Sequence, residues 1–187
     1  MRKPIIRLLD ERDTAAFLEL KRIGLSSDPD AFVAALEDDP PSYPESVRER
    51  LSKASVESGD AILGAFDPQL VGIGSVTRDD RRKRRHKASL HGMYVLPAYR
   101  GQGLGKELLG RLLGLARAMP GLEEIQLVVA AHKTHVVALY ERGGFARVWT
   151  EPHALRIEER SVDAHHMVLD LARVRAEALA TALAMAP

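Results

Sequence analysis

The sequence predicts a mixed α/β domain built around one central sheet. Three apolar, strand-like segments follow one another closely, at residues 61–66, 70–76 and 88–95. An amphipathic helical run comes next, and after it the pattern alternates between strand, helix and two closing strands. Strands joined by short turns pair antiparallel, whereas a crossover through a helix favours parallel pairing. We therefore expect one mixed sheet with a parallel step wherever a helix intervenes.

The composition is that of an ordinary globular protein. The 187 residues are 45% hydrophobic and 28% charged, which is enough for one domain with a substantial core. The formal net charge of +1 gives the whole chain no strong attraction to nucleic acid or to an anionic membrane. Cysteine is absent, which excludes disulfides, thiolate metal sites and a cysteine nucleophile. With no signal-peptide pattern and no long apolar run, we expect a cytoplasmic protein.

The first elements are a short apolar strand at residues 4–9 and a helix that follows it. Asp10 and Asp13 can cap this helix, which is expected to run to about Gly24. Residues 26–44 then contain four prolines and five acidic residues. This composition predicts a loop with a short helical piece.

A second helix is expected at about residues 44–58, before the three strands. The Asp67-Pro68-Gln69 turn joins the strands at 61–66 and 70–76 into a hairpin. The run Arg78–Lys87 then leads into the strand at 88–95. From about Gly103 the apolar period becomes helical, in a stripe formed by Leu104, Leu108, Leu109, Leu112, Leu113, Leu115 and Ala116.

After this helix the chain returns to the sheet. Residues 125–130 predict a buried strand, and residues 134–142 a short helix that ends at two glycines. The segments 145–150 and 162–171 predict two closing strands. The alanine-rich residues 172–187 are expected to be helical, and this helix could pack on the domain or pair two subunits into a homodimer.

A glycine-rich loop precedes the long helix, with the sequence Arg100-Gly101-Gln102-Gly103-Leu104-Gly105 followed by Lys106. A helix N-terminus offers unpaired backbone N–H groups and a positive dipole end, which bind phosphate, and alternate glycines allow close approach. The spacing does not fit the dinucleotide pattern G-x-G-x-x-G. It does not fit the P-loop either, which needs glycine at position 100 and serine or threonine at position 107.

The loop resembles the phosphate loop Gln/Arg-x-x-Gly-x-Gly/Ala of the GCN5-related N-acetyltransferases, the GNAT family. Three further features lie at suitable distances: the strand LHGMYV, the strand IQLVV, and LYERGGF, which is similar to the family's LYxxxGF signature. The resemblance is best over residues 88–171. It implies the GNAT fold, with a mixed, mostly antiparallel sheet of six or seven strands, about four flanking helices and a splay at the cofactor site. It further implies one acetyltransferase domain at 1–171 and a helical extension at 172–187.

The resemblance implies an N-acetyltransferase with acetyl-CoA as co-substrate. The acceptor would be a primary amine, on a small molecule or at a protein N-terminus or lysine. The loop amides would hold the pyrophosphate, through Arg100, Gly101, Gln102, Gly103, Leu104, Gly105 and Lys106. The strand before the loop would offer backbone groups of Met93, Tyr94 and Val95 to the pantetheine. Lys133 stands where the family often has an asparagine that contacts the cofactor, and we expect it to take that place.

The resemblance also implies the catalytic groups. Tyr140 would be the general acid that protonates the departing thiolate. Many members of the family have a glutamate at the position of Ser89, and two residues further on the strand carries His91, which is the candidate general base. Further candidates lie on or between the closing strands, and the choice among them and water stays open: Glu151, His153, Asp163, His165 and His166.

Three other features of the sequence are candidate sites. Arg78–Lys87 holds seven lysines and arginines in ten residues, but it has no aromatic residue for base stacking and is expected to be a solvated hairpin tip. His132 and His135 could share a helical face, but without a third ligand we expect no metal. The acids of residues 26–44, with Asp38 and Asp39 among them, predict a slot for a cationic amine.

Two other function classes stay open alongside the acetyltransferase. One is a CoA-binding regulatory protein with weakened catalysis. The other is a nucleic-acid-associated protein that uses the basic residues 81–87. We expect neither a membrane nor a nucleic acid as a partner.

Overall fold

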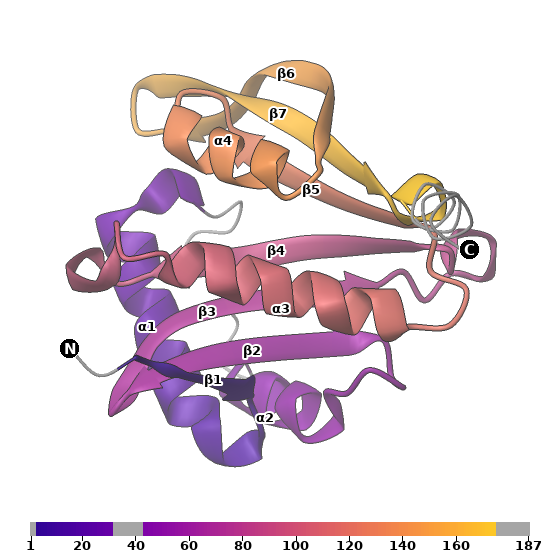
Figure 1. The fold of residues 1–187 in the computed structure, drawn as a ribbon. Helices are drawn as coiled ribbons and strands as arrows, with labels where there is room; N and C mark the ends of the chain where they lie inside the picture. Colours follow the sequence, from indigo (N-terminus) through magenta and orange to yellow (C-terminus); the bar gives the residue numbers. More distant parts are fainter. Residues whose placement is uncertain (1–2, 32–42, 175–187) are drawn as a thin grey trace, which may run out of the picture.

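The computed structural model describes residues 3–31 and 43–174, which form a seven-stranded sheet with the order β1-β2-β3-β4-β5-β7-β6 (Figure 1). The strands are β1 (Ile5–Leu8), β2 (Asp60–Asp67), β3 (Gln69–Arg78), β4 (Lys87–Val95), β5 (Glu124–Ala130), β6 (Ala146–Ile157) and β7 (Arg160–Asp170). The α-helices within the described residues are α1 (Thr14–Ser27), α2 (Tyr43–Lys53), α3 (Leu104–Ala118) and α4 (Thr134–Arg142). The predicted α/β class and number of strands are confirmed.

All neighbouring strands pair antiparallel except β4 and β5, which are parallel. These two strands pair only where Lys87–Ser89 lies beside Glu124–Gln126, and beyond that they diverge. The expected parallel step at every intervening helix is wrong for β1 and β2, which are antiparallel although α1 and α2 lie between them. After one helix, the chain is back at the end of the sheet where the previous strand began, and the next strand runs parallel to it. After two successive helices, the chain is again at the end where the previous strand finished, so the next strand runs antiparallel.

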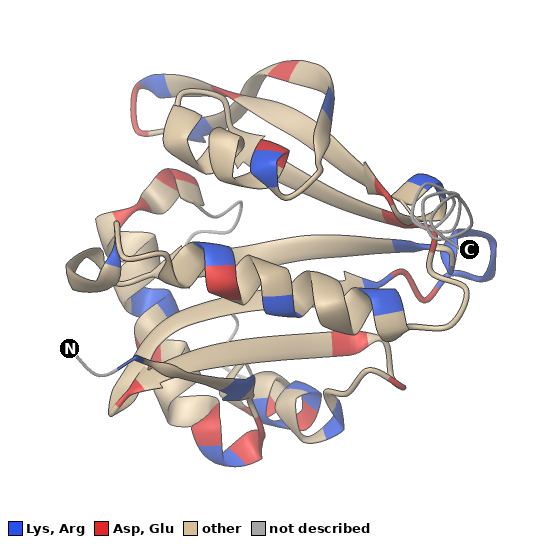
Figure 2. Cartoon of the chain, viewed as in Figure 1, with Lys and Arg blue, Asp and Glu red and all other residues tan. Residues whose placement is uncertain are grey.

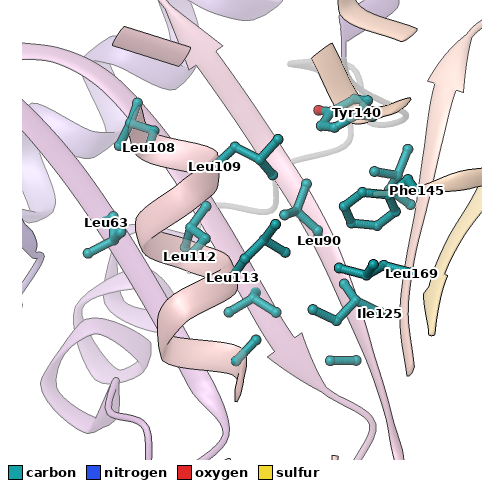
Figure 3. Packing of buried hydrophobic residues seen from close by; sticks show 14 of the residues in the cluster. Leu63, Leu90, Leu108, Leu109, Leu112, Leu113, Ile125, Tyr140, Phe145 and Leu169 are labelled. Atoms are coloured by element: carbon teal, nitrogen blue, oxygen red, sulfur yellow. The ribbon is translucent and has the colours of Figure 1, made fainter. Parts of the chain in front are cut away.

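Helices cover both faces of the sheet. α3 packs on β2, β3 and β4, and it contributes more buried residues to one core than any other single element does (Figure 3). Its buried residues are Leu104, Leu108, Leu109, Leu112, Leu113 and Ala116, as the stripe predicts, while Leu115 is half-buried. α1 and α2 lie on the other face, over a second core that contains Phe17 and Leu51.

Several boundaries differ from the expected ones. α1 continues to Ser27, three residues past Gly24. α2 ends at Lys53 because the next residues form a turn in which Ser55 and Ser58 bond each other's backbone. β6 and β7 extend beyond the predicted segments on both sides of their turn, and only the first residues of the predicted terminal helix, up to 174, are described.

No helix in the described part of the chain is long and apolar enough to cross a membrane.

Candidate active site

A cleft of about 940 Å³ lies where β4 and β5 diverge. The end of β4, the glycine-rich loop, the start of α3, the second half of β5 and α4 all contribute to its walls. The structure therefore brings together eleven of the predicted site residues, namely Met93, Tyr94, Val95, Arg100, Gly101, Gly103, Leu104, Gly105, Lys106, Lys133 and Tyr140. His91 and Gln102 do not line this cleft.

The glycine-rich loop has the backbone that its sequence predicts. Gly101 and Gly103 have φ of +74° and +83°, which L-residues rarely adopt, and a Cβ at either position would meet nothing within 4 Å. The first helical hydrogen bond is donated by Glu107 N–H to the Gly103 carbonyl, at 3.0 Å. Among the described residues, the backbone N–H groups of 101–106 have no backbone acceptor, so they are available to an anion in the cleft.

The basic residues of the loop are used in two different ways. Arg100 donates from Nε to the Val95 carbonyl at 2.8 Å and pairs with Asp28 at 3.3 Å, so it fastens the loop to β4 and to the end of α1. Gln102 similarly donates to the Ala98 carbonyl at 3.0 Å. Lys106 is exposed, and no carboxylate in the described part of the chain pairs with it. Its charge can therefore act on a ligand.

Lys133 belongs to an ion-pair cluster. Its ammonium group binds Asp28 and lies 2.8 Å from the Asp30 carboxylate, which also contacts His132 at 2.7 Å and Arg160 at 3.1 Å. Burial lowers the pKa of Lys133, but the hydrogen bonds to the two aspartates outweigh it and raise the pKa overall. Lys133 is therefore held as a cation by protein carboxylates on one wall of the cleft.

The same cluster changes the interpretation of the acidic segment 26–44. Asp28 and Asp30 are neutralised by basic side chains, so they do not form a free anionic slot for a cationic amine. The expectation of such a slot is wrong for these two residues. Asp38 and Asp39 lie outside the described residues.

Tyr140 is 6% exposed and packs edge-to-face against Phe145, with ring centroids 5.9 Å apart. Within the described residues its hydroxyl has no hydrogen-bond partner, and the side chain lies near Phe145 at the edge of the core (Figure 3). Burial raises the pKa of Tyr140, so the phenol keeps its proton at neutral pH. Since the side chain lines the cleft, its hydroxyl can donate a proton to a group bound there.

A second cleft, of about 550 Å³, lies on the face of the sheet opposite α3. It shares Ala31, Val128 and His166 with the first, so the two clefts meet where β4 and β5 diverge. Val128, expected to be buried, is 49% exposed because it faces this space. Sequence analysis gave no indication of the second cleft, since it depends on the splay.

His91 lines the second cleft and is held by a polar chain beneath it. Its Nε2 lies 2.8 Å from the Thr77 hydroxyl, which donates to Asp60 at 2.8 Å. Part of the side chain faces solvent, yet packing around the ring, helped by the charge of Arg50, lowers its pKa to about 4. His91 is therefore neutral at pH 7 and a weak proton acceptor.

The other candidate bases are divided among separate places. Glu151 and His166 line the first cleft and bond to each other, with 2.7 Å between the carboxylate and Nε2. His165 bonds the Thr150 hydroxyl, and His153 bonds the Ser161 hydroxyl and donates its backbone N–H to Asp163, away from both clefts. Sequence reasoning missed Trp149, whose indole stacks on the His166 ring. Trp149 and Glu151 are two residues apart in one strand, a spacing that already places their side chains on the same face.

The basic run lies at the opposite end of β4 from the glycine-rich loop (Figure 2). Arg81 and Arg84 both pair with Asp79, and Arg78 donates to the Arg85 carbonyl. The run therefore folds partly onto itself at the turn between β3 and β4, and it contributes nothing to either cleft.

Comparison with known proteins gives a consistent result. The model of the acetyltransferase (GNAT) family matches residues 25–145. A mycothiol acetyltransferase of Salinispora tropica is 38% identical over 87 residues, which are 46% of this chain and 28% of that protein. The matched stretch thus spans less than a third of the length of this curated relative.

Solved structures share the whole fold. The acetyltransferase of the GNAT family from Streptococcus pneumoniae has a TM-score of 0.79 and 27% identity, and the match covers 90% of this chain and 100% of that one. The structure of yncA from Salmonella typhimurium, with its cofactor acetyl-CoA, has a TM-score of 0.76 and 23% identity, with 91% and 95% covered. At that identity, the second likeness shows the fold alone.

Proposed function

Because the chain belongs to the acetyltransferase (GNAT) family, we propose that it is an N-acetyltransferase that transfers the acetyl group of acetyl-CoA directly to a primary amine. A single domain over residues 1–171 carries the reaction in this proposal. The observation that supports it most is the meeting, in one cleft, of the unpaired loop amides and the protonated hydroxyl of Tyr140.

The residues present suit acetyl-CoA, which supplies an activated acetyl thioester. The amides of residues 101–106 and the ammonium group of Lys106 would bind its pyrophosphate, since a helix N-terminus and a nearby cation both stabilise an anion. The edge of β4 that faces β5 is unpaired beyond Ser89, so backbone groups on that edge within 93–95, apart from the Val95 carbonyl that Arg100 binds, are available to the pantetheine amides. Lys133, engaged by two aspartates, would shape the wall of the cleft without binding the cofactor directly.

The second cleft would admit the acceptor amine. Attack on the thioester carbon requires a neutral nitrogen, and departure of the thiolate requires a proton, which the hydroxyl of Tyr140 would supply. His91, the base that the family resemblance predicts, lines the second cleft, but its lowered pKa and the bond of its Nε2 to Thr77 make it a weak proton acceptor.

The test is acetylation of a panel of amines by the purified protein. The panel contains arylalkylamines, polyamines, free amino acids and peptides, and mass spectrometry of the products is combined with release of free thiol from acetyl-CoA. We expect at least one amine to be acetylated, and Tyr140→Phe to lower kcat by about 100-fold, as loss of a general acid does. Tyr99→Phe is the control, because the Tyr99 hydroxyl donates to the Asp67 carbonyl.

Binding of acetyl-CoA without acetylation of any amine would contradict the proposal and favour the regulatory alternative. Full activity of Tyr140→Phe would contradict the role of Tyr140 alone.

A further inference from the structure

The strand register brings three side chains together on one face of the β6–β7 pair. Trp149 lies directly opposite His166, and the next residue, Thr150, lies opposite His165. Because side chains alternate along a strand, Trp149, Glu151 and His166 share one face, whereas Thr150 and His165 share the other. The register shifts on both sides of this short stretch, as it does at β-bulges that direct side chains toward a site.

The three side chains are in direct contact. His166 Nε2 lies 2.7 Å from a Glu151 carboxylate oxygen, and the indole of Trp149 stacks on the imidazole at 4.8 Å with 24° between the rings. Glu151 accepts the Nε2 proton, so the lone pair of the neutral ring is on Nδ1. Within the described residues Nδ1 has no hydrogen-bond partner, and the side chain is 30% exposed, so this nitrogen is open to a ligand.

The position of His166 separates it from every other candidate base. It lines the first cleft, as Tyr140 does, and it also lines the second. His91 lines only the second cleft, and its Nε2 is bound to Thr77. An amine that enters through the second cleft therefore passes His166 on its way to a thioester held in the first.

We infer that His166 is the general base of the proposed acetyl transfer, with Glu151 and Trp149 as its positioning residues; the inference rests on the proposed function. The acceptor ammonium gives its proton to Nδ1, and the freed lone pair forms the C–N bond as the C–S bond breaks. The sulfur takes the proton of the Tyr140 hydroxyl. Two protons then remain, one on the new amide nitrogen and one on the imidazolium; one of them returns to the phenolate through solvent, and the other is released to solvent. The imidazolium formed is stabilised by the carboxylate of Glu151 and by the face of the indole.

The charged and titratable groups around His166 favour this role. On β6 it faces Glu151. Across the second cleft lie His91 on β4, which is neutral, and Lys21 on α1, whose ammonium group bonds the Tyr43 hydroxyl. In the first cleft the cation of Lys133 is already paired with two aspartates. The nearest carboxylate is thus the one that stabilises the protonated ring.

The experiment compares four variants with the acceptor that the amine panel identifies, as kcat/KM from pH 6 to pH 10. His166→Gln is expected to lower kcat/KM by about 100-fold at pH 7, with the KM for acetyl-CoA unchanged. The deficit shrinks toward pH 10, where the amine loses its proton without help. Glu151→Gln is expected to lower kcat by about 10-fold with the same recovery at high pH. His165→Gln, on the other face of the same strand, should stay within about 2-fold of wild type. His91→Gln tests the other candidate base, and its loss of kcat/KM should be smaller than that of His166→Gln and should not shrink toward pH 10.

The outcomes separate the possible failures. A loss in His166→Gln that is equally large at pH 10 indicates a structural role and overturns the inference, as does activity within about 3-fold of wild type at pH 7. A loss confined to His91→Gln overturns it in favour of His91. Wild-type protein that acetylates no amine overturns the proposed function and, with it, the assignment of a base. Thermal unfolding of each variant, and His166→Asn as a second substitution, distinguish lost folding from lost chemistry.

Discussion

Replacing Asp30 by asparagine removes one negative charge from the ion-pair cluster. This cluster joins Asp28 and Asp30, just after α1, to Lys133 and Arg160 beside the first cleft. The Asp30 side chain is 7% exposed and contacts Lys133 at 2.8 Å and Arg160 at 3.1 Å. Burial raises the pKa of this carboxyl, but the hydrogen bonds from these two cations outweigh burial and lower the pKa from 3.8 to about 2.

The expected effect follows from that lowered pKa. A difference between 3.8 in the unfolded chain and about 2 in the folded one corresponds to about 2 kcal/mol of stability at pH 7. Since the folded-state pKa is the lower one, this contribution is complete above about pH 4 and is lost as the pH falls through about 2. About half of it remains at pH 3. In a chain of 187 residues, about 2 kcal/mol corresponds to a decrease in Tm of about 4–8 °C.

The assay is thermal and urea unfolding of wild type and Asp30→Asn at pH 7 and pH 3. Asp80→Asn is the control, because Asp80 is exposed and this substitution removes a charge of the same sign from the surface. An Asp30→Asn protein as stable as wild type at pH 7 would show that the ion pairs of Asp30 do not stabilise the fold. A stability difference that is equally large at pH 3 would refute the electrostatic cause.

Three further predictions concern packing, the cluster and the glycines. Leu112→Ala removes a fully buried side chain of α3 and is expected to lower the free energy of unfolding by about 3 kcal/mol, measured by urea unfolding; a loss below about 1 kcal/mol would contradict the packing described. Lys133→Met should lower the free energy of unfolding by about 2 kcal/mol, because it leaves two aspartates without this cation, but its Kd for acetyl-CoA should stay within about 3-fold of wild type. A folded variant with a much larger loss of affinity would place Lys133 in the cofactor site. Gly103→Ala should lower the free energy of unfolding by about 1 kcal/mol because the φ of Gly103 is +83°. Gly114→Ala, inside α3 with open space around it, should raise that free energy by about 0.5–1 kcal/mol. Equal changes in stability would contradict the role given to the φ of Gly103.

The parts of the fold that sequence could predict are those set by local patterns. The leucine stripe from Leu104 to Ala116 fixes α3 and its buried face, because residues three and four apart share one side of a helix. The Asp67-Pro68-Gln69 turn similarly fixes the β2–β3 hairpin. The glycine-rich loop was also predictable, since φ values above zero at Gly101 and Gly103 require that residue type.

What sequence could not predict depends on contacts between distant residues. Lys133 meets Asp28, 105 positions earlier, only because the end of α1 reaches the loop after β5. The Glu151–His166 pair depends on the register of β6 and β7, which is shifted on both sides of Trp149–Glu151 and which no local period encodes. The exposure of Val128 depends on the divergence of β4 and β5.

Calorimetric titration with acetyl-CoA measures whether the start of α3 binds the pyrophosphate of acetyl-CoA, as we propose. Wild type is compared with Gly105→Glu and Gly114→Glu, which add the same carboxylate at the loop or about two and a half turns further along the helix. Gly105 lines the cleft, its φ is not positive, and a Cβ there would meet only Leu139 at 3.7 Å, so the variant should fold. We predict micromolar binding by wild type and Gly114→Glu and a loss of at least about 100-fold in Gly105→Glu. No binding by wild type, or equal binding by all three proteins, would contradict pyrophosphate binding at the start of α3.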